Sequence, residues 1–128
     1  MAKPEQPQHD RSLLANTLLW SAFFLPPAAW GFHLQFVYAA ADQVCKGGMR
    51  EQMLHIASTA CLVASLLGGI VAFWQWLAAG ATWPSEHRSD FIARQRFLSA
   101  EAMLASLLFG LVIVGQWLAV LHLPPCAH

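Results

Sequence analysis

Three apolar stretches dominate this chain, and each is long enough to cross a lipid bilayer. Each contains roughly 25 or more mostly apolar residues, whereas about 20 suffice to span hydrocarbon as a helix. Charged residues make up 11% of the 128 positions and are gathered in short islands between the stretches. A soluble helix of this length carries a charged face. The sequence therefore predicts an all-α membrane protein with three transmembrane helices and no second domain.

Helix-capping residues and helix breakers give the expected boundaries. Asp10 or Ser12 is expected to cap the first helix and Ser89 or Asp90 the third, since these side chains accept backbone N–H groups. The expected segments are a polar N-terminal tail at 1–11, a three-helix domain at 12–123 with spans at 12–42, 51–80 and 90–122, and a C-terminal tail at 124–128.

A proline pair, Pro26-Pro27, interrupts the first span. Proline removes a backbone hydrogen bond and its ring collides with the carbonyl four residues earlier. We therefore expect the first helix to be kinked or briefly broken at this pair.

The basic residues predict the orientation. The N-terminal tail and the second loop lie on one side of a three-span protein, and they contain five lysines and arginines, whereas the first loop contains only Lys46 and Arg50. Cytoplasmic loops are enriched in Lys and Arg. We expect the N-terminus and second loop in the cytoplasm and the C-terminus outside, in a bacterial cytoplasmic membrane.

Two of the three cysteines follow transmembrane helices. Cys45 follows the first helix and Cys126 the third, so the topology places both on the outer face, where disulfides form in bacteria. We predict a Cys45–Cys126 disulfide; the alternatives are two free thiols or a metal site. Cys61 lies within the second span and is interpreted as a small packing residue.

Three histidines are weak candidates for haem ligation. His33, His55 and His122 all fall toward the outer side of their spans. Two imidazoles at matched depth on facing helices can ligate a b-type haem. However, three helices rarely enclose a porphyrin, so we expect no cofactor and no metal.

A polar stripe follows the outer half of the first span. Gln35, Tyr38 and Asp42 recur at spacings of three and four, which is one helical face. Polar side chains in a span usually face protein or a water-filled cavity. The stripe indicates either a polar contact surface near the outer mouth or a helix that becomes polar as it leaves the bilayer.

Two further features indicate how the helices pack. Gln75 and Glu101 are expected at similar depth, where they form a buried polar pair. Small residues recur along the second and third spans, which lets helix backbones approach closely. These residues are Ala57, Cys61, Ser65, Gly69, Ala102, Ser106 and Gly110.

Sequence signatures of catalysis are missing. The chain has no G-x-S-x-G, H-E-x-x-H, C-x-x-C or phosphate-binding glycine loop, so no catalytic residue is nominated and no enzyme activity is expected. The net charge is zero, which argues against a nucleic-acid partner.

The segment PPAAWGFH at 26–33, followed by Tyr38 and Cys45 and by the ending Pro125-Cys126, resembles small bacterial membrane proteins encoded beside haem–copper cytochrome c oxidases. The resemblance implies an oxidase-associated accessory subunit or assembly factor of the respiratory chain with no redox centre of its own. Two alternatives stay open: a haem- or quinone-linked electron carrier, and a small self-associating channel or signalling protein.

Overall fold

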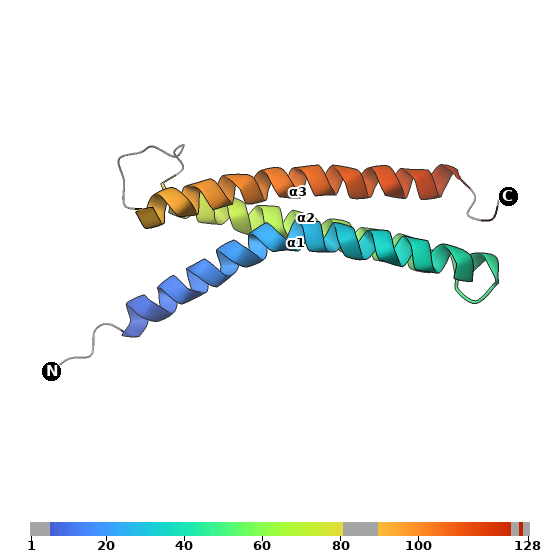
Figure 1. The fold of residues 1–128 in the computed structure, drawn as a ribbon, viewed down its shortest axis with the longest axis horizontal. Coiled ribbons are helices and arrows are strands. Elements are labelled where there is room, and N and C mark those ends of the chain that lie inside the picture. The colour runs from blue at the N-terminus through green and yellow to red at the C-terminus, as the bar shows by residue number, and fades with distance from the viewer. Residues whose placement is uncertain (1–5, 81–89, 124–125, 127–128) are drawn as a thin grey trace.

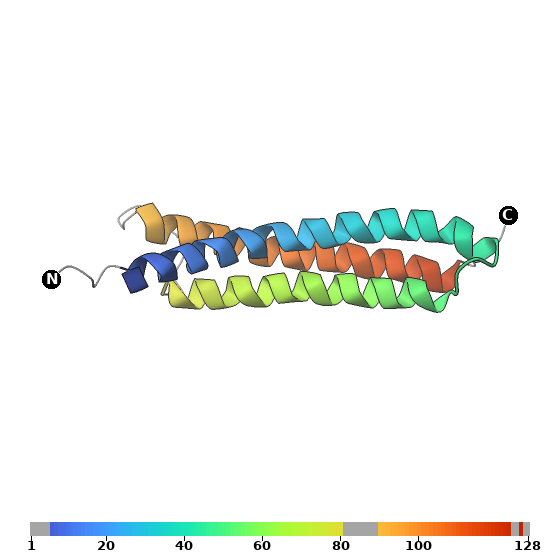
Figure 2. The same cartoon turned by 90° about the horizontal axis from the view of Figure 1, so that it is seen from below.

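The computed structural model describes residues 6–80, 90–123 and 126, and they form a bundle of three long helices (Figure 1). The helices are α1 (Gln6–Cys45), α2 (Gln52–Ala78) and α3 (Asp90–His122). Each helix packs against both of the others, and no strand occurs among the described residues. The views in Figures 1 and 2 show them side by side, with α2 antiparallel to α1 and α3. The predicted all-α, three-helix fold is confirmed.

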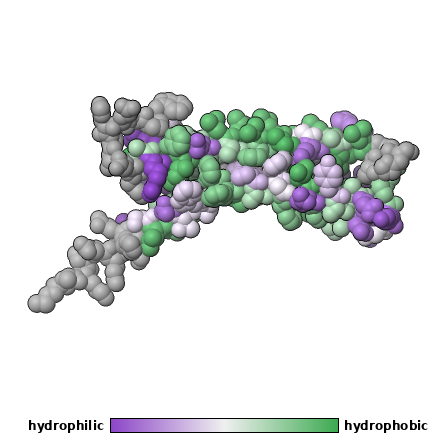
Figure 3. Space-filling model, in the orientation of Figure 1, coloured by the Kyte–Doolittle hydropathy of each residue, from purple (hydrophilic) through white to green (hydrophobic). Residues whose placement is uncertain are grey.

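All three helices are long and apolar enough to cross a membrane. Large apolar side chains cover their outward faces, including Leu66, Leu67 and Ile70 on α2 and Leu104, Leu107 and Leu111 on α3. In the space-filling view of Figure 3, hydrophobic residues fill most of the middle of the molecule and hydrophilic ones gather toward its ends. Such a surface requires lipid, so the chain is a multi-pass membrane protein.

The first helix begins earlier than the sequence indicated. α1 starts at Gln6, inside the predicted tail, so the predicted caps Asp10 and Ser12 both lie within the helix rather than at its end. Pro7 does not oppose this start, because a residue in the first turn has no intrahelical partner for its N–H. The predicted cap Ser89 lies outside the described residues, and α3 begins at Asp90.

Glycines in left-handed conformation end α1 and α2. Gly47, with φ of 75°, donates its N–H to Val44, while Gly48 donates to Gln43 at 2.9 Å. This pair of bonds is a Schellman motif, which satisfies the last carbonyls of a helix and turns the chain sharply. Gly80, with φ of 98°, donates its N–H to Leu77 at the end of α2.

The buried positions follow a 3.5-residue period. Spacings of three and four alternate along α1 and α2, which is the pattern of helices that supercoil with a left-handed twist. The buried residues are Leu19, Ala22, Pro26, Ala29, His33 and Ala40 on α1, and Leu54, Ser58, Cys61, Ser65, Gly68 and Ala72 on α2.

The proline pair bends α1 without breaking it. Both prolines lie inside one continuous helix, and Figure 1 shows the N-terminal part of α1 diverging from the other two helices. Because Pro26 has no N–H, the carbonyl of Ala22 loses its helical partner. That carbonyl and the Pro26 ring lie against Gly68 of α2. A Cβ built on Gly68 would lie 3.3 Å from the carbonyl oxygen and 3.1 Å from Cδ of Pro26. The bend therefore depends on a residue without a side chain at position 68.

Candidate functional site

A hydrogen-bonded node joins one polar residue from each helix in the bundle interior. His33 of α1 is fully buried, and its Nδ1 lies 3.0 Å from Oε1 of Gln116 on α3. Its Nε2 lies 2.9 Å from the hydroxyl oxygen of Ser58 on α2, which is also fully buried. We call His33, Ser58 and Gln116 the histidine node.

The hydroxyl of Ser58 determines which proton His33 carries. It donates to the carbonyl of Leu54 at 2.8 Å, and since it has one hydrogen, it accepts the proton on His33 Nε2. Oε1 of Gln116 is the amide atom at Nδ1, and a 180° turn of the amide exchanges its nitrogen and oxygen, so the amide can either accept or donate in this hydrogen bond.

The histidine node lies within the hydrocarbon rather than at its surface. Ser58 is seven residues from the middle of α2, about 10 Å at 1.5 Å per residue, and the hydrocarbon extends about 15 Å either side of the midplane. Polar side chains at this depth need partners inside the protein. The node thus fixes the rotation of all three helices at one level.

A pair of serines joins α2 and α3 nearer the midplane. Ser65 donates to the Ser106 carbonyl at 3.2 Å and Ser106 donates to the Ser65 carbonyl at 2.7 Å. Gly69 allows this approach, because a Cβ there would stand 2.9 Å from Cβ of Ser106. Among the other small residues predicted to mediate packing, Cys61, Ala102 and Gly110 are buried and Ala57 is half-buried.

The predicted Gln75–Glu101 pair is wrong. Gln75 instead accepts from the side-chain amide of Gln95 on α3, at 3.0 Å to its Oε1 and 3.2 Å to its backbone carbonyl. Glu101 lies six residues after Gln95 on α3, about 9 Å along the helix, and about 100° around it from the buried Ala102 that faces the core. The residue of α3 at the level of Gln75 is therefore Gln95 rather than Glu101.

A buried arginine closes the end of the bundle opposite the cysteines. Arg96 is 2% exposed, and its Nε donates to the Ala79 carbonyl at 2.7 Å. This carbonyl belongs to the C-terminal end of α2, where the helix dipole favours a positive charge. Gly80 makes room, because a Cβ there would stand 2.8 Å from Nη2 of Arg96. The guanidinium thus caps α2, a role that the sequence analysis missed.

The haem candidates are not arranged as ligands. Both ring nitrogens of His33 are engaged in the histidine node, and Nδ1 of His55 accepts from the indole of Trp117 at 2.9 Å. His122 is exposed in the last turn of α3. Within the described residues, no three His, Cys, Asp or Glu side chains are grouped as metal ligands. The engagement of His33 opposes the haem hypothesis.

The polar stripe of α1 faces away from the bundle. Gln35, Tyr38 and Asp42 are all exposed, with Tyr38 at 77%. Asp42 forms an ion pair with Lys46 one turn later at 2.7 Å. Hence Gln35 and Asp42 face outward, whereas Tyr38, although exposed, also borders the groove described below.

The predicted disulfide between Cys45 and Cys126 is present. The two Cα atoms lie 5.4 Å apart, and 81 residues separate the cysteines in sequence. The bridge ties the chain after α3 to the end of α1, and we call this end of the bundle the disulfide end. Cys61 is the remaining cysteine, free and buried.

The disulfide predicts a simple alkylation pattern. Unfolded in denaturant without reductant, the protein is expected to take up one alkyl group, on Cys61; after reduction it is expected to take up three. Intact-mass spectrometry of protein prepared without reductant measures this number. Three groups added before reduction would show that the bridge is absent.

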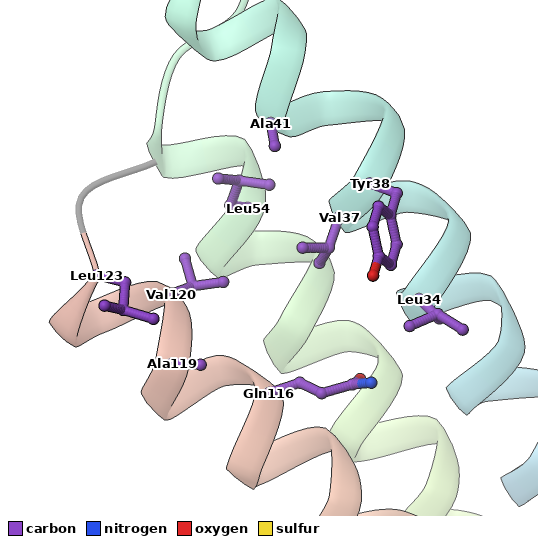
Figure 4. Close-up of a pocket in the computed structure, with 9 residues that line it drawn as sticks. All are labelled: Leu34, Val37, Tyr38, Ala41, Leu54, Gln116, Ala119, Val120 and Leu123. Atoms are coloured by element: carbon purple, nitrogen blue, oxygen red, sulfur yellow. The ribbon is translucent and has the colours of Figure 1, made fainter. Parts of the chain in front are cut away.

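A groove of about 330 Å³ opens at the disulfide end between α1 and α3 (Figure 4). Val37 and Ala41 of α1 face Ala119 and Val120 of α3 across it, and Leu54 of α2 also lines it. Gln116 of the histidine node lies at one end of the groove.

Comparison of the chain with the models of known protein families, with curated proteins and with solved structures finds no match. The site therefore rests on geometry alone. Ser58 and Gln116 were missed in the sequence, although both lie three residues from a buried apolar residue, Ser58 before Cys61 and Gln116 after Ile113. Polar residues within such a period are the signal that could have identified the node.

Proposed function

We propose that the protein is a non-catalytic accessory subunit or assembly factor of a bacterial respiratory complex that contains a haem–copper cytochrome oxidase. It lies in the cytoplasmic membrane with its N-terminus in the cytoplasm. The resemblance of residues 26–33, Tyr38, Cys45 and Cys126 to proteins encoded beside such oxidases supports the identity of the partner. The lysines and arginines of segments 1–11 and 81–96, five against two in the first loop, support the orientation.

The interior of the bundle supports a structural role. Its polar side chains are used to join helices: the histidine node, the Ser65–Ser106 pair and the bond from Arg96 to Ala79. Hydrogen bonds between transmembrane helices stabilise their association. Groups engaged in this way hold a shape rather than carry out chemistry.

The outward polar stripe of α1 is the observation that carries the proposal. Gln35 and Tyr38 are exposed, whereas the outward face of α3 at this level is apolar, as Leu118 shows. An amide group near the edge of the hydrocarbon is stabilised when it contacts protein rather than lipid. A transmembrane helix of a partner subunit supplies this contact.

Site-specific photocrosslinking in native membranes tests the proposal. A photoreactive amino acid at position 35 is expected to capture an oxidase subunit, identified by mass spectrometry. Position 118 is the matched control. His33 and Gln116 are in contact and α1 and α3 run in the same direction, so positions 35 and 118, two residues further along, lie at the same depth. Leu118 is exposed on α3. Capture of a second copy of this chain, or equal capture from both positions, contradicts the proposal.

A further inference from the structure

The groove at the disulfide end combines an apolar lining with two uncharged polar groups. All of its nine lining residues are neutral, and the polar ones are Tyr38 of α1 and Gln116 of α3 (Figure 4). Its volume of about 330 Å³ lies in the range of small-molecule sites. The lining therefore suits an uncharged molecule with oxygen atoms that form hydrogen bonds.

The side-chain amide of Gln116 can form further hydrogen bonds within this groove. One side of its amide is held by His33 Nδ1, and His33 is in turn held by Ser58. An amide offers two N–H donors and an acceptor oxygen, so one contact leaves the others available. Because a fully buried imidazole fixes the amide in place, the remaining groups are pre-organised for a ligand.

The depth of the groove places it between hydrocarbon and interface. Gln116 is level with His33, about 10 Å from the midplane, and Ala41 at the other end lies eight residues further along α1, about 12 Å at 1.5 Å per residue. The groove thus extends from within the outer hydrocarbon to the headgroup region. A ligand reaches it by lateral diffusion in the bilayer.

We propose that this groove binds the ring of an isoprenoid quinone or quinol. The ring lies between the apolar walls of α1 and α3, and one ring oxygen forms a hydrogen bond with the Gln116 amide. The hydroxyl of Tyr38 bonds the other, since in Figure 4 it lies on the side of its ring nearer to Gln116. The isoprenoid tail leaves the groove into the bilayer.

The chemistry of the lining favours a quinone over a phospholipid. A phosphate is recognised by Arg, Lys or clustered N–H groups, and no basic residue lines the groove. An acyl chain alone makes no use of an anchored amide. A ring with two uncharged oxygens matches two uncharged hydrogen-bonding groups. This inference is independent of the oxidase proposal, since it concerns this chain alone.

Binding is tested with full-length protein in phosphatidylcholine nanodiscs, titrated with a quinone that carries two isoprene units. Tryptophan fluorescence reports occupancy, because Trp117 follows Gln116 and quinones quench indoles at short range. We expect saturable quenching at one quinone per chain. Ala119→Phe, which fills the groove, is expected to weaken binding at least tenfold, and Tyr38→Phe about three- to tenfold for one lost hydrogen bond.

Ala39→Phe is the matched control, since Ala39 is exposed on α1 and does not line the groove. It is expected to bind quinone like the unsubstituted protein. The inference is overturned if quenching rises without saturation, as it does when quinone merely dissolves in the bilayer. It is also overturned if the Ala119→Phe and Ala39→Phe variants bind quinone with equal affinity. The result is separable from the oxidase proposal, because a chain that binds no quinone still crosslinks to its partner through position 35.

Discussion

Replacing Gly68 by leucine is expected to lower the free energy of unfolding by about 3 kcal/mol or more, the upper range for overpacking a close contact. A Cβ at this position would lie 3.1 Å from Cδ of Pro26 and 3.3 Å from the carbonyl oxygen of Ala22. Neither a proline ring nor a backbone carbonyl can rotate away as a flexible side chain would. The bent part of α1 must therefore separate from α2.

The measurement is unfolding in mixed micelles of rising sodium dodecyl sulfate content, followed by tryptophan fluorescence. Gly115→Leu is the matched control, since nothing lies within 4 Å of a Cβ built on Gly115. It is expected to change the free energy by less than about 1 kcal/mol, in the direction of greater stability, because leucine favours a helix more than glycine does. Equal destabilisation by the two substitutions would refute the role assigned to Gly68.

Replacing His33 by alanine is expected to lower the free energy of unfolding by about 2 to 4 kcal/mol, the range for large-to-small core substitutions. The substitution leaves a cavity and removes the two hydrogen bonds from His33 to Ser58 and Gln116. Each such bond in a membrane contributes about 0.6 kcal/mol on average and up to about 1.7. Gln116 then keeps no partner within the histidine node.

His55→Ala is the control, because His55 is only half-buried and makes one such bond, to Trp117. It is expected to lower the free energy of unfolding by less than about 1 kcal/mol. A double-mutant cycle of His33→Leu with Gln116→Leu separates the bond from the cavity, with an expected coupling of about 0.6 to 1.7 kcal/mol. Zero coupling would mean that the node contributes packing alone.

Gly68 and His33 both lie in the interface between α1 and α2. Pro26 and His33 lie two turns apart on the buried face of α1, and their contacts Gly68 and Ser58 lie on α2. The glycine permits the close approach, and the hydrogen bonds select one rotation of the helices. We therefore expect both substitutions to disturb the groove beside Gln116 as well as the stability.

Much of the fold was predictable because it depends on local composition. Apolar length placed the three spans, and Pro26 marked the bend. The disulfide was predictable too, because an odd number of crossings puts the residues after the first and third helices at the same end. The early start of α1 was missed, since a proline in a first turn was interpreted as part of a tail.

The polar contacts were harder to predict. Counting residues placed Glu101 at the level of Gln75, yet Gln75 bonds to Gln95, because contact depends on how two helices are offset along their axes and rotated about them. The histidine node was missed for the same reason: Ser58 and Gln116 carry no motif, and only their rotation toward His33 brings them together.

The sequence by itself determined that three helices cross the membrane and that Cys45 and Cys126 meet, because hydrophobic length and the number of crossings are properties of the linear chain. The tertiary structure alone decided which polar side chains are joined inside and which face outward. Helix rotation is set by close packing at Gly68 and Gly69 against other helices, and hydropathy carries no information about that packing.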